Sequence, residues 1–372
     1  MRDLVVTGIG HVSNVGRTGL SSCAAQRAGI ARTAPLDGFF TYDSEELEAP
    51  VTGAPVAGIT DGFFQTSRWL TLGSYALNDL VTTSWPTSAS ELWKRTELIW
   101  TLPRIAFERF QVPEERTDEF LDIACRRSLI ELNELELEPD ALDFLADGPC
   151  CLAEACRSAD ASIADRRIDR VVVLATDSWL DPLSVLMLVD EGRVKGPENP
   201  TGLCPGEAGV ALLLESEAAA NARGATVHAR ILGAATASID PPDESVDELS
   251  DWRAESTVEM GRVLAEAIGA AVVDADLELP FRGDVVIDLN GETWKSMAWG
   301  HALTQLHGVL DHDRAPAIVP AASFGDVGST SAAVGVSVAA HAFGRGSSSS
   351  GQSLVVTLSD MGEAAVLLLG AP

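Results

Sequence analysis

The chain has 372 residues, 46% of them hydrophobic, so it is long and apolar enough to bury a sizeable core as a globular protein. It carries 55 Asp and Glu against 26 Lys and Arg, a formal net charge of −29. A chain this negative repels nucleic acid and anionic membranes, and we expect neither as a partner.

The start of the chain, MRDLVVTGIG, lacks a basic segment followed by a long apolar one, and no apolar run approaches the length of a membrane span. The cysteines lie at positions 23, 125, 150, 151, 156 and 204. They include no CxxC pair and fit neither a disulfide framework nor a zinc site. We therefore expect a cytoplasmic protein with reduced thiols, no cofactor and no metal.

The first half of the chain alternates between strand and helix patterns. We expect, in chain order, a strand at 3–7, a helix at 21–28, surface loops over 34–66, a helix at 69–81, a strand at 97–102, helices at 117–135 and 147–165, a strand at 170–175, a helix at 182–190 and a strand at 210–215.

The second half repeats this alternation. We expect a strand at 226–233, a helix at 256–271, a strand at 284–288, a helix at 294–306, a strand at 317–320, a helix at 327–343 and a closing pair of strands at 353–358 and 364–369. The two halves end in similar phrases, GEAGVALLLE from Gly206 and GEAAVLLL from Gly362. This match indicates an internal duplication, with an N-terminal half of 1–220 and a C-terminal half of 221–372.

The segment Asp147-Gly148-Pro149-Cys150-Cys151 precedes the helix expected at 147–165. Asp147 or Gly148 can cap this helix, and proline is favoured at its first position. Cys150 and Cys151 then fall in the first turn, where free N–H groups and the helix dipole favour a thiolate. Taken alone, the segment favours the other interpretation, in which both cysteines are small apolar residues of a buried helix.

Several motifs, taken in order, resemble those of the β-ketoacyl-ACP synthases of the thiolase superfamily. Val5–Gly10 is similar to that family's opening strand and glycine turn, and Leu203–Gly209 resembles its G-F-x-x-G-E-G-A-G signature. Ser178–Pro182 resembles the loop after the strand that follows the nucleophile helix, and Gly325–Gly328 resembles the turn G-H-x-x-G. The resemblance spans nearly the whole chain and implies an α/β thiolase-like fold. In that fold two duplicated αβαβα halves form a five-layer α-β-α-β-α core.

The resemblance also implies a site, in which a cysteine carries an acyl thioester and two basic side chains stabilise the enolate. Aligning Asp147–Cys150 with the family's D-T-A-C places the nucleophile at Cys150. That alignment leaves the connection to the next strand one residue short, so Cys151, or neither cysteine, stays open. The two histidine positions fall on Asn290 and Asp326.

Other family positions are also replaced. The lysine position falls on Ala321 and the acid position on His301, and the glycine-rich oxyanion loop falls on 359–364, with Asp360, Met361 and Gly362 at its centre. An asparagine cannot transfer a proton at neutral pH, and an ionised aspartate repels a developing enolate. The resemblance therefore predicts a degenerate triad without condensing activity.

Three hypotheses remain open, and with them whether the chain is an enzyme. In the first, the chain is an acyl-binding or structural dimeric partner, similar to a chain-length factor, in fatty acid or polyketide biosynthesis. In the second, it is an acyltransferase or thioester hydrolase that uses Cys150 as a covalent acyl carrier. In the third, it is an interaction module. We expect a homodimer, or a heterodimer with a ketosynthase-like subunit, with an acyl thioester or acyl carrier protein as further partner; the acidic surface predicts weak binding to an acidic carrier.

Overall fold

The computed structural model describes residues 3–42, 45, 47–85, 89–240, 252–275, 277–311 and 313–372. The strands are β1 (Leu4–Ser13), β2 (Ala34–Tyr42), β3 (Glu48–Gly53), β4 (Thr96–Thr101), β5 (Leu142–Leu145), β6 (Arg170–Ser178), β7 (Glu207–Ser216), β8 (Ala229–Ser238), β9 (Asp284–Ile287), β10 (Ala317–Ile318), β11 (Gln352–Leu358) and β12 (Glu363–Gly370). The helices are α1 (Gly19–Arg27), α2 (Thr66–Ser84), α3 (Ala89–Trp93), α4 (Phe107–Phe110), α5 (Thr117–Phe120), α6 (Ser128–Leu132), α7 (Cys151–Ala164), α8 (Pro182–Asp190), α9 (Glu217–Arg223), α11 (Thr257–Asp274), α12 (Thr293–Gln305), α13 (Ala321–Phe324) and α14 (Ser331–Gly344).

Ten strands form one mixed sheet that consists of two sets with the same internal order, β5-β4-β6-β7-β1 and β10-β9-β11-β12-β8. In each set the first three strands are parallel and the last two pairings are antiparallel. The sets meet where Leu4–Val6 of β1 pairs with Ala229–Ile231 of β8. The similar phrases in the sequence thus form corresponding strands, β7 and β12. The division at 220/221 falls within α9 and stays a prediction.

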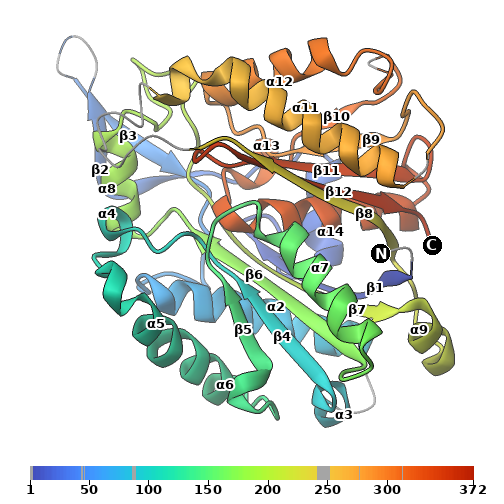
Figure 1. The fold of residues 1–372 in the computed structure, drawn as a ribbon. Helices are drawn as coiled ribbons and strands as arrows, with labels where there is room; N and C mark the ends of the chain where they lie inside the picture. The colour runs from blue at the N-terminus through green and yellow to red at the C-terminus, as the bar shows by residue number, and fades with distance from the viewer. Residues whose placement is uncertain are drawn as a thin grey trace.

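Alternation along the central strands places helices on both faces of each set. Val171 and Val173 of β6 belong to a core that contains α7 and α14, whereas Val172 and Leu174 belong to a core with α2 and α6. On β12, Leu367 likewise faces α7 and α14, and Leu368 faces α11 and α12. Strands buried on both faces are near-continuous apolar runs, as here. The result is five layers, with α7 and α14 in the middle (Figure 1).

Small residues allow the layers to approach closely. The α14 sequence SAAVGVSVAAHAFG is buried from Ala332 to Ala340, as expected for a helix that packs against strands of both sets. A Cβ on Gly335 would lie 2.6 Å from a methyl carbon of Val355. On the other side of the first set, a Cβ on Gly10 would lie 1.9 Å from the carbonyl oxygen of Ala76 in α2. The glycine at position 10 is therefore required by the contact between β1 and α2.

The predicted elements differ from the structure at several places, and β1, expected to end at Thr7, continues to Ser13. Residues 34–66, expected as loops, contain the hairpin β2–β3. The alternation of apolar and polar residues is hard to recognise in this hairpin, because β2 is mostly exposed and the register shifts between Pro35 and Phe40. The helix expected at 117–135 is divided into α5, a π-helical segment (Leu121–Arg127) and α6. The edge strand β5 was not expected, because its four residues include Asp143 and are too few to show a period.

Among the described residues, none of the helices combines the length and the apolar composition needed to cross a lipid bilayer.

Replacing Gly10 by alanine is expected to lower the free energy of unfolding by about 3 kcal/mol or more, because the new Cβ overlaps the backbone of α2. The matched control is Gly300→Ala in α12, where a Cβ meets nothing within 4 Å. Alanine there should raise stability by about 0.5–1 kcal/mol through helix propensity. Chemical denaturation measures both; equal stability of the two variants would contradict the packing argument.

Candidate functional site

Cys150 lies immediately before the middle-layer helix α7 and not inside it. It occupies the N-cap position with φ −87° and ψ −10°, and α7 begins at Cys151. The expectation that Pro149 opens the helix is therefore wrong. The reason is a turn at Gly148, which has φ +90° and whose carbonyl oxygen accepts a hydrogen bond from the Cys151 N–H. Cys150 is buried, with 7% of its surface exposed.

The environment of Cys150 favours a protonated thiol. Burial raises its pKa, and the carboxylates of Asp288 and Glu363 raise it further, while a hydrogen bond from Thr357 acts in the opposite direction. The thiol donates to the main-chain carbonyl oxygen of Glu363 at 3.3 Å, and the Thr357 hydroxyl approaches the sulfur at 3.9 Å. Desolvation and the nearby acids thus act against the thiolate that the helix start was expected to favour.

Cys151 has a different environment. Its sulfur accepts a hydrogen bond from the Asp147 N–H at 3.3 Å, and burial raises the pKa of its thiol to about 12. Cys150, by contrast, lies against the turn between β11 and β12, on which the expected oxyanion loop falls. The assignment of Cys150 as the nucleophile position stays a prediction.

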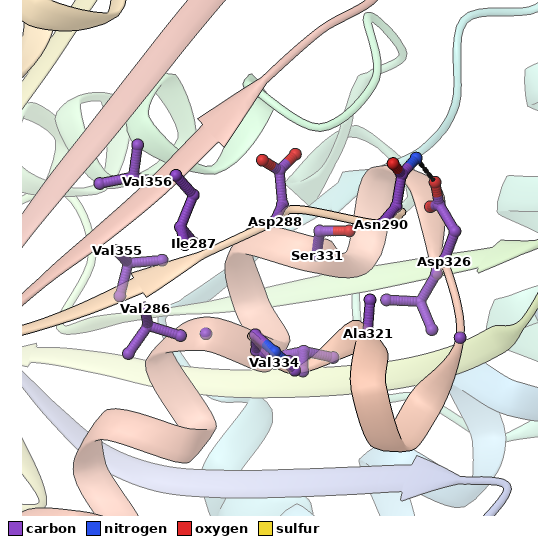
Figure 2. A pocket seen from close by; sticks show the side chains of 14 residues that line it. Val286, Ile287, Asp288, Asn290, Ala321, Asp326, Ser331, Val334, Val355 and Val356 are labelled. Atoms are coloured by element: carbon purple, nitrogen blue, oxygen red, sulfur yellow. Dashed lines mark hydrogen bonds between the residues drawn. The ribbon is translucent and has the colours of Figure 1, made fainter. Parts of the chain in front are cut away.

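The two positions predicted for the replaced histidines contact each other. The side-chain amide of Asn290 donates to Asp326 Oδ2 at 2.6 Å (Figure 2). The same amide donates to Glu292 Oε2 at 2.8 Å. The other carboxylate oxygen of Asp326 accepts from the Gly328 N–H at 2.8 Å and from the Trp179 indole at 3.3 Å. Both hydrogens of the Asn290 amide are therefore used within the protein.

Arg193 supplies the main positive charge beside this pair. Its guanidinium binds both oxygens of Glu292, at 2.8 and 3.0 Å, and also contacts Asp360 at 3.1 Å and Glu191 at 3.6 Å. Burial acts to raise the pKa of Glu292, but Arg193 and the Asn290 amide outweigh it and hold this pKa at about 2. Glu292 is thus an ionised, buried carboxylate that orients Asn290.

A second buried ion pair lies closer to Cys150. Lys295 Nζ binds Asp288 Oδ2 at 2.7 Å, and the Leu358 N–H points at both oxygens of that carboxylate, at 3.3 and 3.2 Å. Burial lowers the pKa of Lys295, but Asp288 more than compensates, so the pKa is raised and the ammonium stays charged. Since Leu358 follows Thr357 in β11, this pair is connected to the residue that contacts the Cys150 sulfur.

The segment at the expected oxyanion loop uses its donors internally. The Met361 N–H donates to Ser359 Oγ at 3.1 Å, and the Gly362 N–H donates to the Ser359 carbonyl oxygen at 3.2 Å. The Asp360 carboxylate points to Arg193 and Arg253. An oxyanion hole requires free donors aimed at the developing charge, and these two amides are already engaged in the turn.

The space at these residues is small. A cavity of about 10 Å³ lies beside Asp288, Asn290 and Asp326, with Val286, Val334 and Val355 on its apolar side (Figure 2). This volume holds about one water molecule. An acyl chain of several carbons does not fit there.

The side chains that the sequence analysis did not single out are Arg193, Glu292, Asp288, Lys295 and Thr357. Each is polar; four of them are buried residues, and Asp288 is partly exposed as a residue although its side chain is only 6% exposed. Ala321 begins α13, whereas His301 lies in α12 beside Gly261 of α11, away from the pair Asn290–Asp326. In the described part of the chain, no three His, Cys, Asp or Glu side chains are grouped so as to hold a metal ion.

Replacing Glu292 by glutamine is expected to lower the free energy of unfolding by about 3–5 kcal/mol at neutral pH, because it leaves Arg193 short of a buried counter-charge. The control is Glu266→Gln in the exposed pair with Arg262, which should cost less than about 1 kcal/mol. Since the Glu292 pKa is lowered from 4.5 to about 2, its contribution is complete above pH 4.5 and lost as the pH falls to about 2. Unfolding curves measured across this pH range give the difference in free energy of unfolding between the wild type and Glu292→Gln. A difference that does not change with pH would contradict the ion-pair argument.

Comparisons with known proteins agree on the fold. No protein-family model matches the chain, and no curated protein sequence matches it. Among solved structures, a type II polyketide ketosynthase in complex with its acyl carrier protein superposes with a TM-score of 0.73 at 16% identity, over 100% of this chain and 99% of that one.

The ishigamide ketosynthase/chain length factor gives a TM-score of 0.73 at 17% identity, again over 100% and 99% of the two chains. A β-ketoacyl synthase from Burkholderia phymatum gives 0.67 at 16% identity over 100% of both. At these identities the likeness concerns the fold. The mixed sheet, its five layers and these neighbours together show that the chain has the thiolase-like fold of the ketosynthases.

Proposed function

We propose that the chain is a ketosynthase-like protein without condensing activity, which acts as a structural subunit of a dimer in the manner of a chain-length factor. The observation that carries the proposal is the contact between Asn290 and Asp326. In place of two proton-transferring or cationic side chains, the site has an amide and a carboxylate that bind each other.

The chemistry of condensation requires donors directed at a thioester carbonyl whose oxygen gains negative charge. Here Asn290 donates both of its hydrogens to carboxylates, and Arg193 and Lys295 are bound by acids. Asp326 would face a developing enolate with a further negative charge. None of these groups is available to stabilise the enolate.

The buried thiol weighs against the alternative, in which Cys150 is a covalent acyl carrier for transfer or hydrolysis. Its raised pKa keeps the thiolate population small at neutral pH, and it is the thiolate that attacks a thioester. The cavity beside Asn290 and Asp326, of about 10 Å³, is too small for an acyl chain. The same small volume favours a structural role over an acyl-binding one.

The neighbours support a dimeric partner. They include a ketosynthase/chain length factor and a ketosynthase in complex with its acyl carrier protein. We propose a homodimer or a heterodimer with a ketosynthase-like subunit in the cytoplasm. The net charge of −29 disfavours direct binding of an acidic acyl carrier protein, which would then depend on the partner subunit.

Alkylation tests the loss of the nucleophile. Incubated with iodoacetamide at neutral pH and mapped by peptide mass spectrometry, Cys150 should react no faster than the buried Cys23 and Cys125. All three should react at least about tenfold more slowly than a free cysteine peptide, because burial raises their pKa. Cys204, which is partly exposed, serves as the more accessible thiol within the same protein, although burial raises its pKa to about 11. Selective, rapid labelling of Cys150 would overturn the proposal in favour of the acyl-carrier hypothesis.

Light scattering and native mass spectrometry test the subunit role. The purified chain should be a dimer, or form a one-to-one complex when expressed with a ketosynthase-like subunit. Removal of the thiol by Cys150→Ala should leave that assembly unchanged, since the role does not depend on acyl transfer. A chain that stays monomeric both alone and in co-expression would refute the subunit role.

A further inference from the structure

A second, larger cleft lies apart from the candidate site, where three segments of the first half meet. It has a volume of about 200 Å³, against about 10 Å³ at Asn290 and Asp326. Its walls come from the end of β1 and the loop after it, the start of β2, and the segment after β3. The lining residues are Ser13, Asn14, Gly16, Arg17, Arg32, Thr33, Ala34, Pro55, Val56 and Ala57.

The charge of this cleft is the opposite of that of the chain. Its lining includes two arginines and no acid, although the chain contains 55 Asp and Glu. Most arginines of the protein pair with a carboxylate within 4 Å, as Arg68 and Arg109 do. Within the described ranges no such partner lies beside Arg17 or Arg32. Two unpaired guanidinium groups at one cleft in so acidic a chain indicate a site for an anion.

The two arginines come from different segments of the cleft wall. Arg17 follows β1, and one of its terminal nitrogens lies 3.4 Å from where a Cβ on Gly58 would stand, so it reaches the segment after β3. Arg32 lies in the segment just before β2. Both side chains are exposed, so their guanidinium groups are accessible from solvent.

Asn14 makes the wall of the cleft rigid. Its side-chain amide donates to the carbonyl oxygens of Arg32, at 2.8 Å, and Ser323, at 3.0 Å. The oxygen of the same side chain is buried and has no hydrogen-bond partner among the described residues. As an acceptor this oxygen offers no hydrogen bond to an anion, so the contribution of Asn14 to the site is the fixed position of the Arg32 main chain.

We propose that this cleft is a binding site for the phosphate group of a small molecule. A phosphate dianion can accept a pair of hydrogen bonds from each of two planar guanidinium groups. A carboxylate has two oxygens and can accept such a pair from only one guanidinium group. The Thr33 side chain and the neutral remainder of the lining leave room for the rest of the molecule. The inference concerns a different part of the surface from the candidate active site and holds whether or not the proposed function is correct.

Isothermal titration of the full chain with inorganic phosphate, and with acetate as the carboxylate probe, tests the site. Saturable phosphate binding is expected, with a dissociation constant of about 1 mM or lower. Arg17→Gln and Arg32→Gln should each weaken it by about tenfold, and the double variant should abolish it. The control is Arg345→Gln, an exposed arginine after α14 that is absent from the cleft lining and should bind phosphate as the wild type does.

Circular dichroism verifies that the variants are folded, which is expected because Arg32 contributes to the fold through its main-chain carbonyl and not its side chain. Phosphate binding to the wild type that does not saturate would refute the proposed binding site. Equal phosphate affinity of the wild type and the double variant would also refute it. Acetate that binds as tightly as phosphate would overturn the assignment of the ligand class.

Discussion

The guanidinium group of Arg193 is the charge on which the arrangement of the candidate site depends. It is buried, and a buried cation is stable only with close counter-charges. Glu292 and Asp360 meet this requirement, and both belong to the second half of the chain, whereas Arg193 precedes β7. One buried ion cluster therefore holds together segments that are 99 and 167 positions apart in sequence.

The orientation of the neighbouring groups follows from that cluster. With both oxygens of Glu292 bound to Arg193, Oε2 also accepts from Asn290, and the second hydrogen of the amide is directed to Asp326. Asp326 is in turn held by the Gly328 N–H. Each donor in the series is matched by an acceptor of the protein itself. A substrate carbonyl would have to compete with ionised carboxylates for the same hydrogens, and it would lose, because hydrogen bonds to charged acceptors are stronger.

The sequence was sufficient for most of the fold because the fold depends on patterns that extend over many residues. Nine strands and most helices were expected near their observed positions, and the match between Gly206–Glu215 and Gly362–Leu369 corresponds to the repeated strand order. The expectations failed where the pattern is short or solvent-exposed, as in β2, β3 and β5.

The site was harder to anticipate, because its properties come from contacts that no local pattern reports. The motifs located Asn290 and Asp326, and the structure places them in contact. Nothing near Cys150 in sequence indicates that Asp288 and Glu363 lie close enough to raise its pKa. Arg193 could not be recognised as a central residue either, since its partners lie at 292 and 360. Lys295, one of only three lysines and seven residues after Asp288, was the one signal available for the second ion pair.

The contrast between scaffold and site shows how, under the proposed function, the fold would be retained without condensing activity. The scaffold depends on small residues at close contacts, such as Gly10 against α2 and Gly335 against β11, and on strands buried on both faces. None of these positions takes part in acyl transfer. Conversely, a catalytic histidine contributes little to packing, and its replacement removes a charge or a donor while leaving the core intact. Under the proposed function, Asn290 and Asp326 occupy the positions of two such donors, and Arg193 and Lys295 are neutralised by nearby acids. The buried polar network then serves to hold the two halves in register.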